Sequence, residues 1–186
     1  MSTVFRSVMA ASVAGLALAM AAPASAEDVK IGFLGGFTGP IESLTPPIFN
    51  GVKLAVDQVN AQGGILDGKI NLVQGDSTCA DTTAASGAAD RMVNSENVTA
   101  LVGPLCSGAT IAAANTAAIP GGVLLISPAA TSPALTGLDD NDLVFRTAPS
   151  DAYQGQMLAK TLRADGADNI AITYVNNDYG KGLADA

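Results

Sequence analysis

Residues 29–36 read VKIGFLGG, and residues 48–64 read IFNGVKLAVDQVNAQGG. The first stretch is a short apolar run closed by two glycines, which is typical of a buried strand followed by a tight turn. The second stretch ends in Gly63-Gly64, as expected where a helix stops and the chain turns with positive φ. Its apolar residues recur at the spacing of one helical face, and they are Ile48, Val52, Ala55, Val56 and Val59.

The same strand-then-helix pattern repeats along the rest of the sequence. Short apolar strands that alternate with amphipathic helices are typical of a parallel sheet with helices on both faces, so the predicted fold class is α/β. Further strands are predicted at 69–74, 99–102, 123–127 and 169–175, a short extended piece at 143–146, helices at 81–95, 107–118 and 152–164, and a last helix from Gly180.

Ligands of open α/β sheets bind beyond the carboxyl ends of the strands. The turn GGFTGP at 35–40 also has the glycines of a phosphate-binding loop, but it lacks the G-x-G-x-x-G and G-K-[ST] spacings, so a plain tight turn is favoured. The segments that follow the predicted strands, and that we expect to form the candidate site, are 35–43, 76–79, 103–108, 127–132 and 176–180.

The first 26 residues have the pattern of a secretory signal peptide. Arg6 precedes an apolar run from Val8 to Ala22, and Ala24-Ser25-Ala26 fits the small-residue cleavage rule. The alternative is a membrane anchor, but the run is shorter than the roughly 20 apolar residues that a spanning helix needs. We therefore expect export to the periplasm and a mature chain that starts at Glu27.

The composition argues against several classes of function. Without the signal peptide, 8 basic residues face 17 acidic ones, a net charge of −9. Nucleic-acid binding requires a basic surface that such a chain does not provide. The sequence has no histidine, so it cannot form a histidine-activated nucleophile, and it lacks the commonest zinc ligand. We expect no enzyme activity, no metal and no cofactor.

The two cysteines, Cys79 and Cys106, belong to a chain that we expect to enter an oxidising compartment, which favours a disulfide. The alternative is two buried free thiols. Both cysteines follow predicted strands, so a disulfide would clamp two neighbouring strand-to-helix turns. In the chain-entropy view, closing this loop stabilises the fold by roughly 3 kcal/mol.

Two of the strand-end segments carry hydroxyl groups suited to a ligand. Ser107 lies where a strand ends and a helix begins, so free N–H groups and the positive end of the helix dipole suit a carboxylate there. An ordinary helix N-cap is the alternative role of Ser107. Residues 127–133 (SPAATSP) form a second polar rim with a shape fixed by prolines, and Tyr179 follows the last predicted strand, where simple packing is the alternative.

With these features, the sequence resembles the type I periplasmic binding proteins of the leucine/isoleucine/valine-binding group. The matching segments together cover nearly the whole chain after residue 26, in the order that the family has. They are GGFTGP at 35–40, NGVKLAVDQVNAQGGI at 50–65, GDSTC at 75–79, VGPLCSGAT at 102–110, SPAATSPALT at 127–136, FRT at 145–147 and NDYGKGLA at 177–184.

This resemblance implies two similar α/β lobes joined by crossing strands, with a ligand trapped between them when they close about a hinge. It assigns residues 27–147 to lobe one and 148–186 to the start of lobe two, with Phe145-Arg146-Thr147 as the first hinge strand. Members of the family are longer, so we expect the sequence to be a truncated part of a longer protein.

The resemblance also implies the ligand contacts. Ser107 and Thr131 match positions that hold the α-carboxylate of the ligand. Ala129 through its carbonyl and Thr131 through its hydroxyl match positions that hold the α-ammonium, and Tyr179 matches an aromatic residue from lobe two.

Other positions either match the family or depart from it. The family has a disulfide at the places of Cys79 and Cys106. Leu44 occupies a position that is aromatic in the family, so the pocket differs there and a branched-chain preference stays open. An acidic partner for the ammonium lies, in the family, beyond residue 186.

From these observations we expect a monomeric, non-catalytic solute-binding protein that delivers an amino acid, branched-chain or otherwise apolar, to the membrane permease of an ABC transporter. One alternative is a binder of another carboxylate, such as an aromatic acid. A second is the ligand-binding half of a sensor or receptor. A secreted enzyme on the same fold is the remaining alternative.

Overall fold

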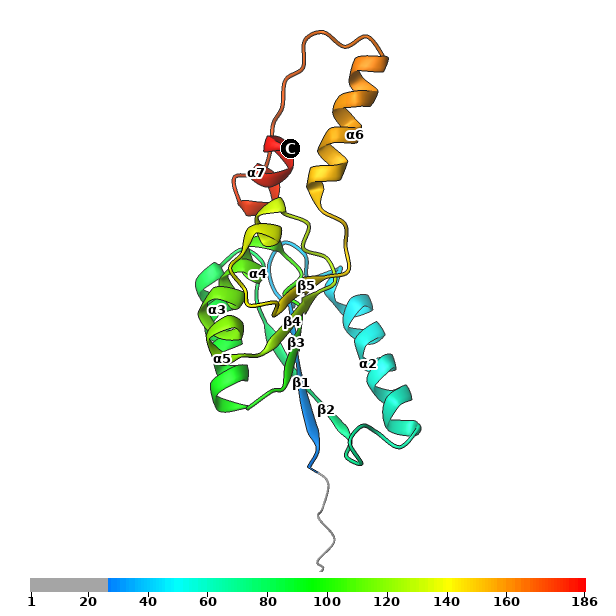
Figure 1. The fold of residues 1–186 in the computed structure, drawn as a ribbon, viewed down its shortest axis with the longest axis vertical. Helices are drawn as coiled ribbons and strands as arrows, with labels where there is room; N and C mark the ends of the chain where they lie inside the picture. The colour runs from blue at the N-terminus through cyan, green and yellow to red at the C-terminus, as the bar shows by residue number, and fades with distance from the viewer. Residues whose placement is uncertain (1–26) are drawn as a thin grey trace, which may run out of the picture.

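The computed structural model describes residues 27–186, so the predicted signal peptide at 1–26 lies outside the described residues. Its centre is a five-stranded sheet with the order β2-β1-β3-β4-β5 (Figure 1). All four strand pairs are parallel, which agrees with the sequence prediction. The strands are β1 (Val29–Gly35), β2 (Ile70–Asp76), β3 (Ala100–Val102), β4 (Leu124–Ser127) and β5 (Val144–Arg146).

Helices cover both faces of the sheet. In Figure 1, α2 lies on one side of the strands and α3 and α5 lie on the other, while α6 and α7 extend beyond the carboxyl ends of the strands. The helices are α2 (Thr45–Ala61), α3 (Thr82–Asp90), α4 (Ser107–Ala113), α5 (Ile119–Gly121), α6 (Asp151–Ala164) and α7 (Asp178–Asp185), with π-helical turns at Arg91–Ser95 and Ala114–Ala118 and the 3₁₀ helix η4 at Pro133–Gly137.

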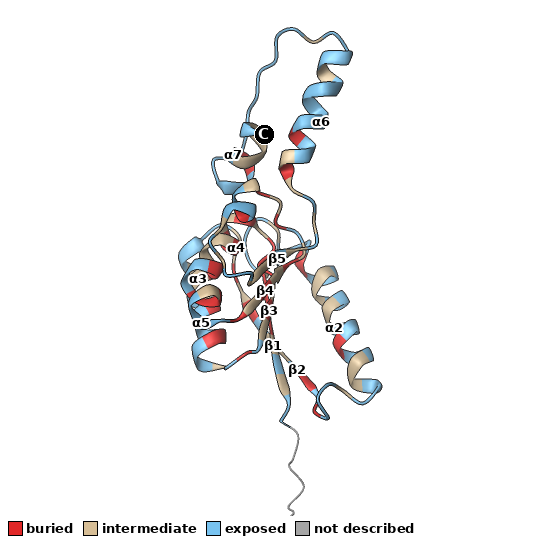
Figure 2. Ribbon diagram, viewed as in Figure 1, coloured by how far each residue is buried: buried red, intermediate tan, exposed pale blue. Residues whose placement is uncertain are grey.

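The hydrophobic core lies between the sheet and the α3–α4 layer. Large side chains from the strands and small alanines from the helices interlock there, so the helices approach the sheet closely. On the α2 side, only Thr45 and Val56 of that helix are buried, and Figure 2 shows the difference between the two faces. The core residues are Leu34, Met92, Val93, Val98, Leu101, Val123 and Leu125 with Ala89, Ala113, Ala114, Ala117 and Ala118.

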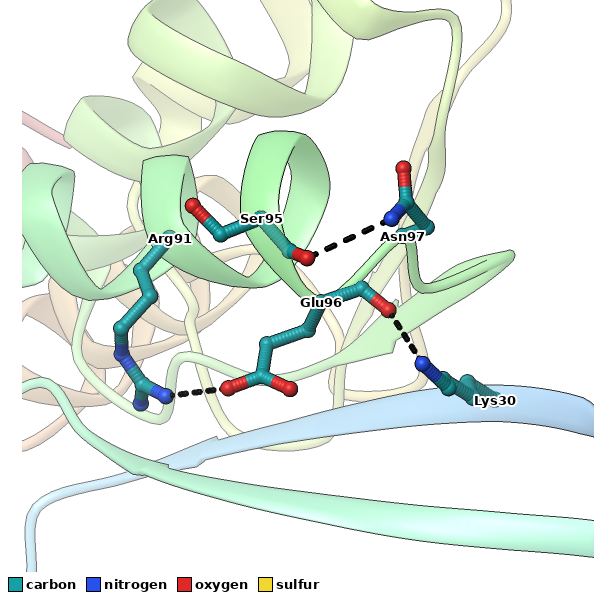
Figure 3. A network of polar contacts seen from close by, with 5 residues as sticks. All are labelled: Lys30, Arg91, Ser95, Glu96 and Asn97. Atoms are coloured by element: carbon teal, nitrogen blue, oxygen red, sulfur yellow. Dashed lines mark hydrogen bonds and ion pairs between the residues drawn. The ribbon is translucent and has the colours of Figure 1, made fainter.

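Exposed polar contacts lie around the turn that leads into β3, at the edge of the sheet where the strands begin (Figure 3). Lys30 donates to the Glu96 carbonyl at 2.9 Å, and Arg91 pairs with the Glu96 carboxylate at 2.8 Å. The side chains of this ion pair remain 48% and 37% exposed, so water screens it and its contribution to stability is about 0–1 kcal/mol.

The prediction of a strand at 169–175 is wrong. This segment has no regular secondary structure, and Ile170, Ile172, Tyr174 and Val175 are all more than half exposed. A strand is stable only when neighbouring strands satisfy its N–H and C=O groups, and the described strands all belong to the sheet that ends at β5. The apolar composition of residues 169–175 is therefore not sufficient to make this segment a strand.

Candidate functional site

The loops that follow β1 to β4 meet at one edge of the sheet, because all these strands run in the same direction. This agrees with the expected grouping of 35–43, 76–79, 103–108 and 127–132. The fifth expected segment, 176–180, follows no strand. It reaches the same edge differently, as the start of α7, which packs against α4 and η4.

Cys79 and Cys106 form a disulfide with their Cα atoms 5.4 Å apart. The expectation that the two residues follow neighbouring strands is wrong, because β1 lies between β2 and β3. Two strands separated by a third lie about 9.6 Å apart, so the loops must lean together over the end of β1. Thr78 and Cys79, in the loop after β2, both have left-handed backbone, with φ of 53° and 69°.

The turn between β3 and α4 depends on Gly103. Its φ is 93°, and a Cβ atom at this position would lie 2.1 Å from the Leu34 carbonyl oxygen. Only glycine fits such an approach of two backbones. The chain then passes through Pro104 after a cis peptide bond, and Cys106 becomes the residue that precedes α4.

Ser107 is the first residue of α4, and the N-cap position belongs to Cys106, so the N-cap alternative for Ser107 is wrong. Its hydroxyl oxygen instead accepts hydrogen bonds from the N–H groups of Thr131 at 3.3 Å and Ser132 at 3.1 Å. Both oxygen lone pairs are therefore occupied, and the hydroxyl proton remains to be donated. Ser107 is 1% exposed, so in this arrangement its hydroxyl is closed off from solvent.

Thr131 makes a reciprocal pair of hydrogen bonds with Asp151, the first residue of α6. The Thr131 hydroxyl donates to the Asp151 carboxylate at 2.8 Å, and the Asp151 N–H donates to the Thr131 carbonyl at 2.9 Å. Asp151 is 2% exposed, and its charge sits favourably at a helix N-terminus. Sequence reasoning missed this residue, and the signal that could have found it is an acid directly after Ser150, which caps α6.

Arg146, the last residue of β5, fixes the other side of the same loop. Its guanidinium donates to the Ser132 carbonyl at 2.7 Å and to the Thr136 hydroxyl. The loop that carries Thr131 is thus held by Ser107 of α4, by Arg146 of β5 and by Asp151 of α6. Such fixed loops are typical of a preorganised binding surface.

Asp76 is the last residue of β2, and its hydrogen bonds join the loop after β1 to the loop after β2. Its carboxylate accepts from the N–H groups of Phe37 and Thr78 and from the Thr38 hydroxyl. Partial burial raises the pKa of this carboxyl, but the hydrogen bonds, that of Thr38 first, outweigh it and hold the pKa below its ordinary value of 3.8.

The remaining predicted site residues are Ala129, Leu44 and Tyr179, and all three are exposed at the surface. Ala129 is exposed on the loop of Thr131. Leu44 precedes α2 and is 58% exposed, and Tyr179 in the first turn of α7 is 46% exposed. The structure therefore brings Ser107 and Thr131 into direct contact, and it leaves Leu44 and Tyr179 open at the surface.

Two cavities lie near this edge. The larger, of about 650 Å³, lies between β5, η4 and the start of α6, with Arg146 and Tyr153 in its wall. The smaller, of about 420 Å³, lies between η4, the start of α6 and α7, with Ser132 and Asp178 in its wall. Neither cavity is lined by Ser107 or Thr131.

Residues 27–186 include no helix both long and apolar enough to cross a membrane, and no group of His, Cys, Asp or Glu side chains that could hold a metal ion. An open parallel sheet with fixed polar loops at the carboxyl ends of its strands defines the class of α/β proteins that bind ligands at that edge.

Comparison with known proteins gives a family within this class. Residues 28–186 match a sequence family described as "Periplasmic binding protein". The Leu/Ile/Val-binding protein of Escherichia coli K12 is 37% identical over 172 residues, which are 92% of this chain and 46% of that protein. The chain belongs to the periplasmic binding protein family, and it spans about half the length of the curated relatives it matches.

Solved structures agree with this family. The branched-chain amino acid transporter substrate binding protein LivJ from Streptococcus pneumoniae, in complex with isoleucine, superposes with a TM-score of 0.71 at 32% identity, over 86% of this chain and 45% of that one. An ABC transporter substrate-binding protein from Desulfitobacterium hafniense, in complex with Leu, superposes with a TM-score of 0.70 at 33% identity and the same coverage.

Proposed function

We propose that the protein is a periplasmic solute-binding protein that captures an apolar α-amino acid for an ABC transporter. The observation that carries the proposal is the direction of the hydrogen bonds around Ser107 and Thr131. The Ser107 hydroxyl has only its proton left for a ligand, because its oxygen already accepts two hydrogen bonds. The Thr131 hydroxyl has only its lone pairs left, because it donates its proton to Asp151.

The Ser107 hydroxyl suits the carboxylate of the ligand. Its oxygen already accepts from two backbone N–H groups, so the O–H group turns toward any further partner as a donor. A donor in a buried, water-poor position pairs best with a negatively charged acceptor. The net charge of the chain is negative, so the anion is held by local donors and not by a general positive field.

The Thr131 hydroxyl suits the ammonium. Its single proton is donated to Asp151, so toward a ligand it can only accept. The buried negative charge of Asp151 directly behind it adds an attraction for a cation. Ser107 as a donor and Thr131 as an acceptor are in contact with each other in the fold. Such a pair matches the carboxylate and the ammonium that an α-amino acid carries on one carbon.

The lobe assignment gives the mechanism of capture. We assign residues 27–147 to lobe one and 148–186 to the start of lobe two, with the hinge next to Thr147. Ligand enters while α6 and α7 stand away from the strand ends, and closure then buries Ser107 and the ligand together, with Tyr179 brought in from α7. Enclosure of this kind removes most of the surface of a small ligand from water.

Relatives support the ligand class and the partner. The two solved relatives named above have isoleucine and leucine bound, at 32% and 33% identity. We infer the same class of ligand here, with Leu44 and the Ala129 carbonyl beside it, and a monomer exported through a cleaved signal peptide that docks on a membrane permease without catalysing a reaction.

The test is calorimetry on the full-length exported protein with three matched ligands: L-leucine, its amide and 4-methylpentanoate, which lacks the amino group. Loss of a charge-assisted hydrogen bond costs about 1.5–3 kcal/mol, roughly ten- to a hundredfold in affinity. We expect each analogue to bind that much more weakly than leucine. Equal binding of 4-methylpentanoate would favour the simple-carboxylate alternative, and equal binding of the amide would refute the carboxylate contact.

A further inference from the structure

Bonds between loops run in a continuous series along the carboxyl edge of the sheet. The Asp76 carboxylate joins the loop after β1 to the loop after β2, and the Cys79–Cys106 disulfide joins that loop to the one after β3. Ser107 then joins the loop after β3 to Thr131 in the loop after β4. The proposed ligand contacts lie at one end of this series, and Asp76 lies at the other.

Three hydrogen bonds converge on Asp76. Its Oδ1 atom accepts from the N–H groups of Phe37 at 3.0 Å and Thr78 at 2.8 Å, and its Oδ2 atom accepts from the Thr38 hydroxyl at 2.6 Å. One side chain thus fixes both the turn after β1 and the beginning of its own loop. Loss of the carboxylate would release both loops together.

The backbone of these loops needs such a constraint. Thr78 and Cys79 both adopt left-handed φ angles, which cost a non-glycine residue about 1–2 kcal/mol each and persist only where the surroundings enforce them. The two loops also touch directly, since a Cβ atom at Gly39 would lie 2.5 Å from the Thr78 carbonyl oxygen. The hydrogen bonds of Asp76 are among the contacts that hold these angles.

We propose that Asp76 is a positioning residue for ligand binding. It holds the loop of Cys79 in the conformation that the disulfide transmits to Cys106 and, one residue on, to Ser107. Asp76 acts through these loops and does not contact the ligand. The role rests on the proposed function, because it is exerted on the affinity for an amino acid.

The experiment compares Asp76→Ala and Asp76→Asn with the wild type as full-length exported proteins. Amide hydrogen exchange at Phe37 and Thr78 is measured without ligand, and L-leucine affinity is measured by calorimetry. We expect Asp76→Ala to raise exchange at both amides and to weaken leucine binding about tenfold. Asn keeps an oxygen that accepts from the two N–H groups, so Asp76→Asn should recover most of the affinity.

A second variant guards against misfolding. Thr38 is exposed, so Thr38→Val removes the hydroxyl that donates to Asp76 without disturbing the core. We expect a loss of leucine affinity of about threefold. An affinity equal to that of the wild type in both Asp76→Ala and Thr38→Val overturns the proposal.

The matched control is Asn60→Ala. Asn60 lies in α2 and contacts the first residue of β2, at the end of that strand opposite Asp76. Asn60 exchanges two hydrogen bonds with the backbone of Ile70, at 2.9 and 2.7 Å. Its loss should lower stability and leave leucine affinity unchanged, whereas an equal loss of affinity would mean that Asp76 is merely structural. If the wild type binds no leucine, the proposed function fails, and the exchange data still decide on Asp76, because unchanged exchange at Phe37 and Thr78 overturns its role.

Discussion

Thr131 and Asp151 exchange two hydrogen bonds, one from the Thr131 hydroxyl to the Asp151 carboxylate at 2.8 Å and one from the Asp151 N–H to the Thr131 carbonyl at 2.9 Å. The loop after β4 is thereby joined to the first residue of α6. The same pair sets the direction of the Thr131 hydroxyl, and with it the kind of ligand group that this hydroxyl can bind.

Replacement of Asp151 by Asn keeps an oxygen for the Thr131 proton but removes the charge. The substitution removes the attraction between this charge and the ammonium of the ligand. Two unit charges about 4 Å apart interact by about 1 kcal/mol even in water, so we expect leucine affinity to fall roughly fivefold. Binding of 4-methylpentanoate, which has no ammonium, should not change. Calorimetry checks this, with Asp165→Asn, an exposed carboxyl at the end of α6, as the control. Equal losses for both ligands would contradict the ammonium role.

Replacement of Ser107 by Ala should affect stability and binding together. It leaves the N–H groups of Thr131 and Ser132 without their acceptor in a buried position. We expect a loss of about 1–3 kcal/mol in the free energy of unfolding and a leucine affinity lowered at least tenfold. Urea unfolding and calorimetry measure the two effects. Ser95→Ala, at the opposite edge of the sheet, should change neither.

The stability contributed by Asp76 should depend on pH. Its folded-state pKa lies below the ordinary value of 3.8, so the unfolded chain takes up the proton first as the pH falls. The contribution is therefore complete above this ordinary value and is lost as the pH falls through the lower folded value. In urea unfolding from pH 2 to 7, the difference between wild type and Asp76→Asn should be constant at neutral pH and shrink below pH ~4. A difference that grows toward acid would contradict this.

Gly103→Ala should destabilise the protein strongly, because its Cβ atom would lie 2.1 Å from the Leu34 carbonyl oxygen at a φ of 93°. We expect a loss of more than about 2 kcal/mol. Gly51→Ala is the matched control, since a Cβ atom there meets nothing within 4 Å and the residue lies inside α2. That substitution should stabilise by about 0.5–1 kcal/mol. Thermal unfolding of both variants checks the contrast.

The disulfide should be present in the protein purified under non-reducing conditions. Thiol titration under denaturing, non-reducing conditions is expected to find no free thiol. Replacement of both Cys79 and Cys106 by Ser should lower the free energy of unfolding by about 3 kcal/mol, because the loop between them is no longer closed in the unfolded chain. Two reactive thiols in the native sequence would refute the pairing.

Sequence reasoning predicted the local elements well where a pattern and its environment agree. The apolar run that ends at Gly35-Gly36 indicated a buried strand, and β1 forms there with Phe33 and Leu34 fully buried. The same reasoning predicted a strand at 169–175 from apolar residues alone and was wrong. It also missed Asp151, because the partner that gives this residue its role lies 20 positions away in the sequence.

The sequence by itself determined the alternation of strands and helices, and with it the parallel sheet and the edge where its loops gather. These properties follow from periodicity and from glycine and proline turns, which act over a few residues. Only the tertiary structure decided that β1 separates β2 from β3, that Ser107 is an acceptor for the Thr131 loop and that Asp151 takes the Thr131 proton. Strand order and hydrogen-bond partners depend on which distant surfaces pack together, and no short stretch of sequence contains that information.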